Sequence, residues 1–138
     1  MTNTVAFGSD DWLRLFHEKA LARQDLLESF RDFEGPITLV MNPHRKKFLA
    51  GLIIWIDAGS GVIRKVEKLD FPDDKETKFT LTGSYKTWAS IAQGETNIIE
   101  AIVVGSIQVE GEKALLIRQV QTADILGRIM KEMPVAYD

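Results

Sequence analysis

The chain has 138 residues, a length that fits one domain with a substantial hydrophobic core. Its net charge of −3 argues against a nucleic-acid-binding domain, which normally carries a basic surface, and the absence of cysteine excludes disulfides and thiolate chemistry. The most apolar window, FLAGLIIWI at residues 48–56, is less than half of the ~20 residues that a membrane-spanning helix needs. We therefore expect a single domain over residues 1–138 that works in the cytoplasm.

An amphipathic helical segment is predicted over residues 9–33, because its apolar side chains recur at helical spacing. Ser9 is the expected N-cap, and two aspartates follow it at the positive end of the helix dipole. Arg23 interrupts the apolar stripe, so this segment is either one helix or two helices that meet near Arg23–Gln24. Gly35–Pro36 ends the helical pattern, and the sheet and core are expected over residues 35–133.

Strands are predicted in the middle of the chain. Four segments have β-type composition or alternation: 37–41, 48–57, 62–69 and 77–82. Short turns join the first three, which indicates an antiparallel meander. The segment 48–57 is apolar on both faces and is therefore expected at the centre of the sheet.

Helical spacing returns in the last third of the chain. Ser84 is the expected N-cap of a short helix that ends at Gly94, and Asn97 is the expected N-cap of a second one. Residues 106–110 alternate as a strand, and the pattern from residue 112 onward is helical, with a break near Gln119 and Thr122 as the cap of a final helix. This order of elements favours an α+β fold.

Motifs for catalysis are absent from the sequence. The only histidines, His17 and His44, have no partner at a metal-ligand spacing, and no nucleophile or phosphate-loop motif occurs. We expect no enzyme, no catalytic residue, no metal and no cofactor. The basic run His44, Arg45, Lys46 and Lys47 is either a solvated hairpin tip or a point of transient contact with an anionic membrane.

The segment TLTGSYKTWASIAQGETNIIEAIVVGSIQVEGE, residues 80–112, resembles the C-terminal block of the sterol carrier protein 2 family. The resemblance implies an α+β fold with a five-stranded, largely antiparallel sheet, one face covered by helices, and an apolar tunnel between them. It also implies non-catalytic binding of fatty acyl chains, acyl-CoA, sterols or other lipids. The positions that carry it are Leu81, Trp88, Ile91, Gly94, Ile102, Gly105, Ile107, Val109 and Gly111.

Bulky apolar residues of the last third are the candidates for lining such a tunnel, and plain core packing is an equally good interpretation of each. The polar Gln119 and Thr122 either meet a ligand headgroup at the tunnel mouth or cap a helix break. An alternative function is a protein-interaction module, or a homodimer, that uses the same apolar groove. The candidate ligand-binding residues are Trp88, Ile91, Ile98, Ile102, Val103, Ile107, Leu116, Gln119, Leu126 and Met130.

Overall fold

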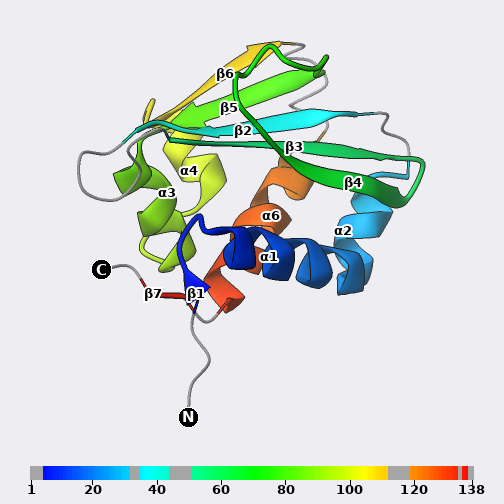
Figure 1. The fold of residues 1–138 in the computed structure, drawn as a ribbon, viewed down its shortest axis with the longest axis horizontal. Coiled ribbons are helices and arrows are strands. Elements are labelled where there is room, and N and C mark those ends of the chain that lie inside the picture. The colour runs from blue at the N-terminus through cyan, green and yellow to red at the C-terminus, as the bar shows by residue number, and fades with distance from the viewer. Residues whose placement is uncertain (1–4, 32–34, 44–50, 112–118, 134, 137–138) are drawn as a thin grey trace.

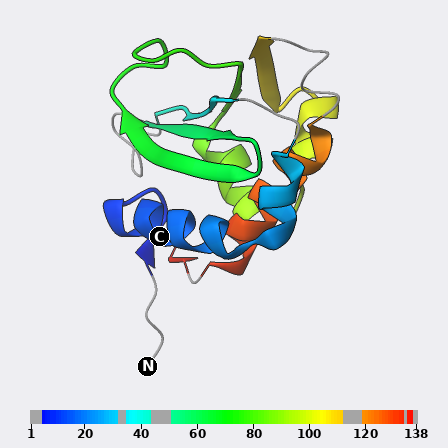
Figure 2. The same ribbon diagram turned by 90° about the vertical axis from the view of Figure 1, so that its right-hand side faces the viewer.

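A five-stranded sheet carries a layer of helices on one of its faces (Figures 1 and 2). The computed structural model describes residues 5–31, 35–43, 51–111, 119–133 and 135–136. The strand order is β4-β3-β2-β5-β6, and a separate two-stranded parallel pair joins β1 to β7. The predicted α+β class and the five-stranded sheet covered by helices are confirmed. The strands are β1 Val5–Ala6, β2 Ile37–Met41, β3 Leu52–Gly59, β4 Val62–Leu69, β5 Phe79–Gly83, β6 Ile107–Gly111 and β7 Val135–Ala136.

Strands β2, β3 and β4 form the antiparallel meander that the sequence predicts. The middle of the sheet, however, belongs to β2 and not to the segment 48–57, of which the structure describes residues 51–57. The reason is that β5 pairs in parallel with β2, after a connection over residues 70–78 that passes across the outer face of the sheet (Figure 1). Trp55 on this outer face donates its indole N–H to the carbonyl oxygen of Glu76 in that connection at 2.9 Å. The inner face of β3 is buried and its outer face is partly covered, which accounts for apolar residues on both faces of the strand.

The helices are α1 Asp10–Ala22, α2 Gln24–Ser29, α3 Tyr85–Ala92, α4 Ile98–Val103 and α6 Val120–Glu132. The predicted caps at Ser9, Ser84 and Asn97 are confirmed, because each side chain accepts a hydrogen bond from a backbone N–H three residues later. The predicted cap at Thr122 is wrong. Gln119 stands at the N-cap position of α6 without a capping hydrogen bond from its side chain, and Thr122 lies inside the helix.

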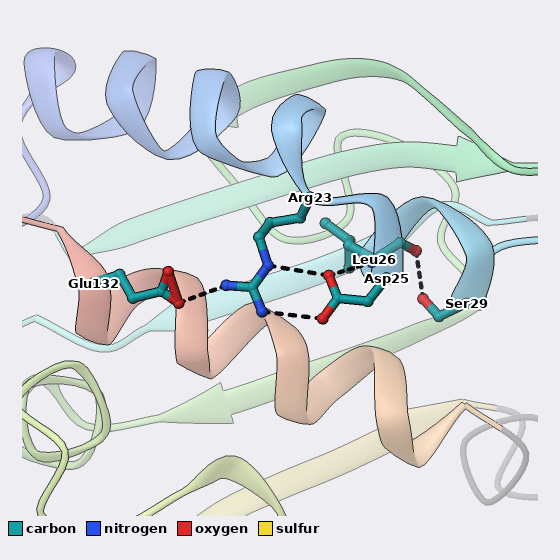
Figure 3. Close-up of polar contacts among 5 residues, drawn as sticks. All are labelled: Arg23, Asp25, Leu26, Ser29 and Glu132. Carbon is teal, nitrogen blue, oxygen red and sulfur yellow. Dashed lines mark hydrogen bonds and ion pairs between the residues drawn. The ribbon is translucent and has the colours of Figure 1, made fainter.

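Arg23 separates α1 from α2 and connects both to α6 (Figure 3). Its extended backbone, with φ −90° and ψ 103°, interrupts the helix at the position that the sequence indicates. The guanidinium donates two hydrogen bonds of 3.0 Å to Asp25 and a third to Glu132 of α6. A charged residue in an apolar stripe is thus explained by its two carboxylate partners.

The inner face of the sheet, the face that the helices cover, is apolar along its middle strands. Cross-strand pairing places Leu39 of β2 between Ile54 of β3 and Leu81 of β5, and all three side chains are fully buried. The apolar residues of α1, α2, α3, α4 and α6 join them in one continuous core. Burial of this surface, at roughly 25 cal/mol per Å², is the main favourable contribution to folding.

Two glycines with positive φ bracket β6, and their surroundings differ. Gly105, with φ +85°, has no atom within 4 Å of the position that a Cβ would take. At Gly111, with φ +118°, a Cβ would meet the carbonyl oxygen of Lys78 and would lie 2.8 Å from the Cα of Phe79. Gly105 therefore serves only the backbone turn from α4 into β6, whereas Gly111 also permits the close approach of β6 to β5.

We expect Gly105→Ala to lower the free energy of unfolding by about 1 kcal/mol, the usual cost of forcing φ > 0 on alanine. Gly111→Ala should lower it by about 3 kcal/mol or more, because backbone atoms of β5 must also move. Urea unfolding of the two variants measures the difference. Equal losses would show that the close approach at Gly111 is not a constraint.

A second prediction concerns Asp25. Its hydrogen bonds from Arg23 lower the pKa of its carboxyl below the ordinary value. The stabilisation is therefore present above the unfolded pKa of ~3.9 and is lost as the pH falls through the lowered folded pKa. Between pH 5 and pH 2 the unfolding free energy of the wild type should fall more steeply than that of Asp25→Asn. Parallel pH profiles in urea titrations would contradict this.

Candidate functional site

The candidate site is the apolar layer between the inner face of the sheet and the helices α3, α4 and α6. Trp88 of α3 fixes one side of it, because its indole N–H donates to the carbonyl oxygen of Val40 at 2.9 Å. A Cβ placed on Gly83 of β5 would lie 3.1 Å from Trp88 Nε1 and 3.2 Å from Ile107 Cγ1. The ring of Trp88 and the first residue of β6 therefore converge on one glycine of the sheet.

Gly127 of α6 is a second glycine that permits close packing, in this case between helices. A Cβ at this position would lie 3.2 Å from Ile91 of α3 and 3.4 Å from Ile98 of α4. The absence of a side chain lets the three helices approach closely, which brings residues of α3, α4 and α6 to a single apolar layer.

The structure brings together most of the residues predicted to bind ligand. Ile102 is partly buried and packs against the core. Val103 is 78% exposed, so its side chain does not face the apolar layer. Leu116, like the basic run 44–47, lies outside the described residues. The predicted residues that are fully buried in the common core, at 0–2% exposure, are Trp88, Ile91, Ile98, Ile107, Leu126 and Met130.

A polar cluster lies where α2 meets the start of α6. The hydroxyl of Thr122 is 2.8 Å from both Ser29 Oγ and Gln119 Oε1, and Ser29 donates in turn to the carbonyl oxygen of Leu26. Gln119 is 9% exposed and Thr122 is 1% exposed. These groups satisfy one another's hydrogen-bonding needs and join α2 to α6.

A cluster of aromatic rings occupies the start of α1, and the sequence alone does not reveal it. Trp12 stacks on Phe16 with ring centroids 5.4 Å apart, and Phe7 packs edge-to-face against Trp12 at 5.1 Å and against Tyr85 of α3 at 5.5 Å. Helical spacing places Trp12 and Phe16 on one face of α1. Phe7 lies outside every predicted element, so no periodicity signals its contact with Tyr85.

The apolar layer holds little that could transfer a proton. In the described part of the chain the buried polar side chains are Thr38, Gln119 and Thr122, and no group of histidines and carboxylates is placed to hold a metal. The shifted pKa values belong to surface ion pairs: hydrogen bonding to Lys75 lowers the pKa of Glu67, and Asp25 raises that of Arg23. The described residues show a packed apolar layer where the resemblance implies a tunnel.

None of the described helices is both long and apolar enough to cross a membrane.

Residues 26–124 match the family model described as "SCP-2 sterol transfer family". The fold resembles the crystal structure of sterol carrier protein 2, with a TM-score of 0.81 and 20% identity over 92% of this chain and 98% of that one. It also resembles the solution structure of a conserved hypothetical protein, possibly a sterol carrier protein, from Thermus thermophilus. Here the TM-score is 0.80 and the identity 19%, over 99% of this chain and 96% of the other.

A third similar structure is that of palmitated SCP2L2 from Aedes aegypti, with a TM-score of 0.54 and 15% identity over 88% of this chain and 96% of that one. No curated protein sequence matches the chain significantly. These structural likenesses establish the fold, and the family model covers most of the chain, including β2 to β6 and the packed helices α3 and α4. This chain belongs to the SCP-2 sterol transfer family.

Proposed function

We propose that this protein binds lipids without catalysis and transfers them, holding fatty acyl chains, acyl-CoA, sterols or similar molecules in the apolar layer between sheet and helices. The observation that carries the proposal is the composition of that layer. Leu39, Ile54 and Leu81 form its floor, and Trp88 and Met130 belong to the helices that cover it. Membership of a lipid-transfer family and the palmitated state of the Aedes aegypti relative support it.

The energetics suit such a ligand. Burial of each methylene is worth about 0.8 kcal/mol, so ten of them give a gross ~8 kcal/mol before ordering costs are subtracted. An apolar site distinguishes ligands that differ by one methylene only about tenfold or somewhat more. We therefore expect binding of a range of chain lengths with modest selectivity.

Binding requires the packed layer to open, since most of its described side chains, including those of Trp88, Ile98 and Met130, are only 0–2% exposed. Helix α4 is the element best suited to move, because it has only six residues and is followed, after its C-cap, by Gly105, where a Cβ would meet no atom within 4 Å. Met130, with its flexible thioether chain, is suited to repack around a ligand. The ligand-lining residues in this proposal are Trp88, Ile91, Ile98, Ile102, Ile107, Leu116, Gln119, Leu126 and Met130.

Lipid should be recovered from the purified protein by organic extraction and identified by mass spectrometry. A fluorescent fatty acid added to the delipidated protein should bind saturably and should be displaced by unlabelled acyl chains or sterol. Recovery of no lipid together with no displaceable binding would contradict the proposal. A protein that instead self-associates through this layer would show dimer formation in ultracentrifugation without lipid.

Chain-length preference tests the position of the site. Ile98→Ala removes a buried side chain between α4 and α6 and should cost about 2–4 kcal/mol of stability. The space that it creates should shift the preferred acyl chain to a greater length in displacement titrations. Val104→Ala, at an exposed position at the end of α4, is the matched control and should leave both stability and preference unchanged. The same length preference in Ile98→Ala and wild type would place the ligand elsewhere.

A further inference from the structure

The three tryptophans differ in what their indole N–H groups contact. Trp55 donates to the carbonyl oxygen of Glu76 and Trp88 to that of Val40, both at 2.9 Å. Trp12 is the exception: it is 0% exposed, and no acceptor within the described part of the chain lies in hydrogen-bonding reach of its Nε1. Its donor group is thus buried and unpaired, although the chain satisfies the same group twice elsewhere.

An unpaired buried donor is unusual, because buried polar groups in native proteins are nearly always hydrogen-bonded and leaving one unpaired opposes folding. The aromatic neighbours do not replace an oxygen acceptor. Phe16 is stacked on the indole at an interplanar angle of 12°, so its ring faces the indole plane and not its edge. Phe7 is nearly perpendicular, at 81°, and an N–H to ring contact is a second-order interaction.

We propose that Trp12 Nε1 donates a hydrogen bond to an uncharged oxygen of the bound lipid, a hydroxyl or an ester carbonyl. The inference rests on the proposed lipid-binding function and assigns Trp12 as a residue that determines which lipids bind well. The indole N–H would then select for one polar atom on an otherwise apolar molecule.

The position of Trp12 connects it to the apolar layer. Phe7 bridges Trp12 to Tyr85, and Tyr85 lies one helical turn before Trp88 on α3. Helix α1 also packs directly against α6, which carries Leu126 and Met130. Trp12 and the buried residues of α3 and α6 belong to one continuous core, so a ligand that extended the layer toward the start of α1 would reach the indole.

The oxygen is expected to be uncharged because the positive charge at this end of α1 is already matched: Asp10 and Asp11 occupy the first turn of the helix, and Lys68 pairs with Asp10. The rings packed on Trp12 are Phe7 and Phe16, and none of the buried side chains in the described part of the chain is basic. Arg23 stands at the other end of α1, about 16 Å away at 1.5 Å per residue. Burying a carboxylate without a cationic partner is far more costly than burying a hydroxyl that finds a donor.

Displacement titrations with dodecane, dodecanol and dodecanoate separate these possibilities in the wild type and in Trp12→Phe. Loss of the donor should weaken dodecanol binding about tenfold relative to dodecane, the size expected when a buried polar group loses its partner. Phe16→Leu is the matched control: it removes a ring from the same cluster without removing a donor, and should change dodecane and dodecanol affinities by the same factor.

An NMR measurement on the wild type tests the same hydrogen bond without any substitution. In a ¹⁵N–¹H spectrum the indole resonance of Trp12 should move on addition of dodecanol and stay close to its ligand-free position with dodecane. Equal weakening of dodecane and dodecanol in Trp12→Phe, or an indole resonance that responds alike to both, would overturn the inference while leaving lipid binding intact. A tenfold loss confined to dodecanoate would overturn the choice of an uncharged oxygen. Failure of all three ligands to bind the wild type would instead remove the proposed function itself.

Discussion

The inner face of the sheet must be kept from water, and the arrangement of the helices follows from this constraint. Strands β2, β3 and β5 present branched and aliphatic side chains to one side. No single helix among the described residues is large enough to cover them. Helices α1, α3, α4 and α6 cover them together, and α2 belongs to the same continuous core. The apolar layer that results is the principal source of stability.

Polar contacts join some of the helices to one another and not others. Arg23 joins the junction of α1 and α2 to Glu132 near the end of α6, and the cluster of Ser29, Thr122 and Gln119 joins α2 to the beginning of α6. These three helices are thus connected at two separated points. Helix α4 has no comparable link among the hydrogen bonds seen between described side chains. With only six residues, α4 is held mainly by the packing of its apolar side chains.

Much of the architecture follows from local sequence signals. The N-caps at Ser9, Ser84 and Asn97, the interruption at Arg23, and the boundaries of β2 and β4 are all readable from spacing and residue type. Thr122 looks like a cap in the sequence because it and Gln119 are polar positions within an apolar stripe. In the folded chain a side chain from α2, nearly a hundred residues earlier, supplies its hydrogen-bonding partner. Long-range polar pairing of this kind leaves no trace in periodicity.

The site was harder to predict than the fold, because the same physical property marks core and binding surface. Ile98 and Val103 look equivalent as branched residues of one short helix, yet one is completely buried and the other largely exposed. Six residues give too few turns for periodicity to assign the faces reliably. The contact between Phe7 and Tyr85, and the missing partner of Trp12, depend on how distant elements meet and could be found only in three dimensions.

The parallel pairing of β2 with β5 has a consequence for how the chain reaches its native state. Ile37 pairs with Phe79 and Met41 with Gly83, whereas the meander from β2 to β4 needs only near neighbours along the chain. Closing the long loop between β2 and β5 loses more chain entropy than forming either hairpin, so the meander should assemble first and the β5–β6 pair should dock onto it afterwards. Until that docking occurs, one edge of β2 has no strand beside it. Docking of β5 would then limit the rate of folding. Until it occurs, the newly made protein would be open to strand-mediated aggregation.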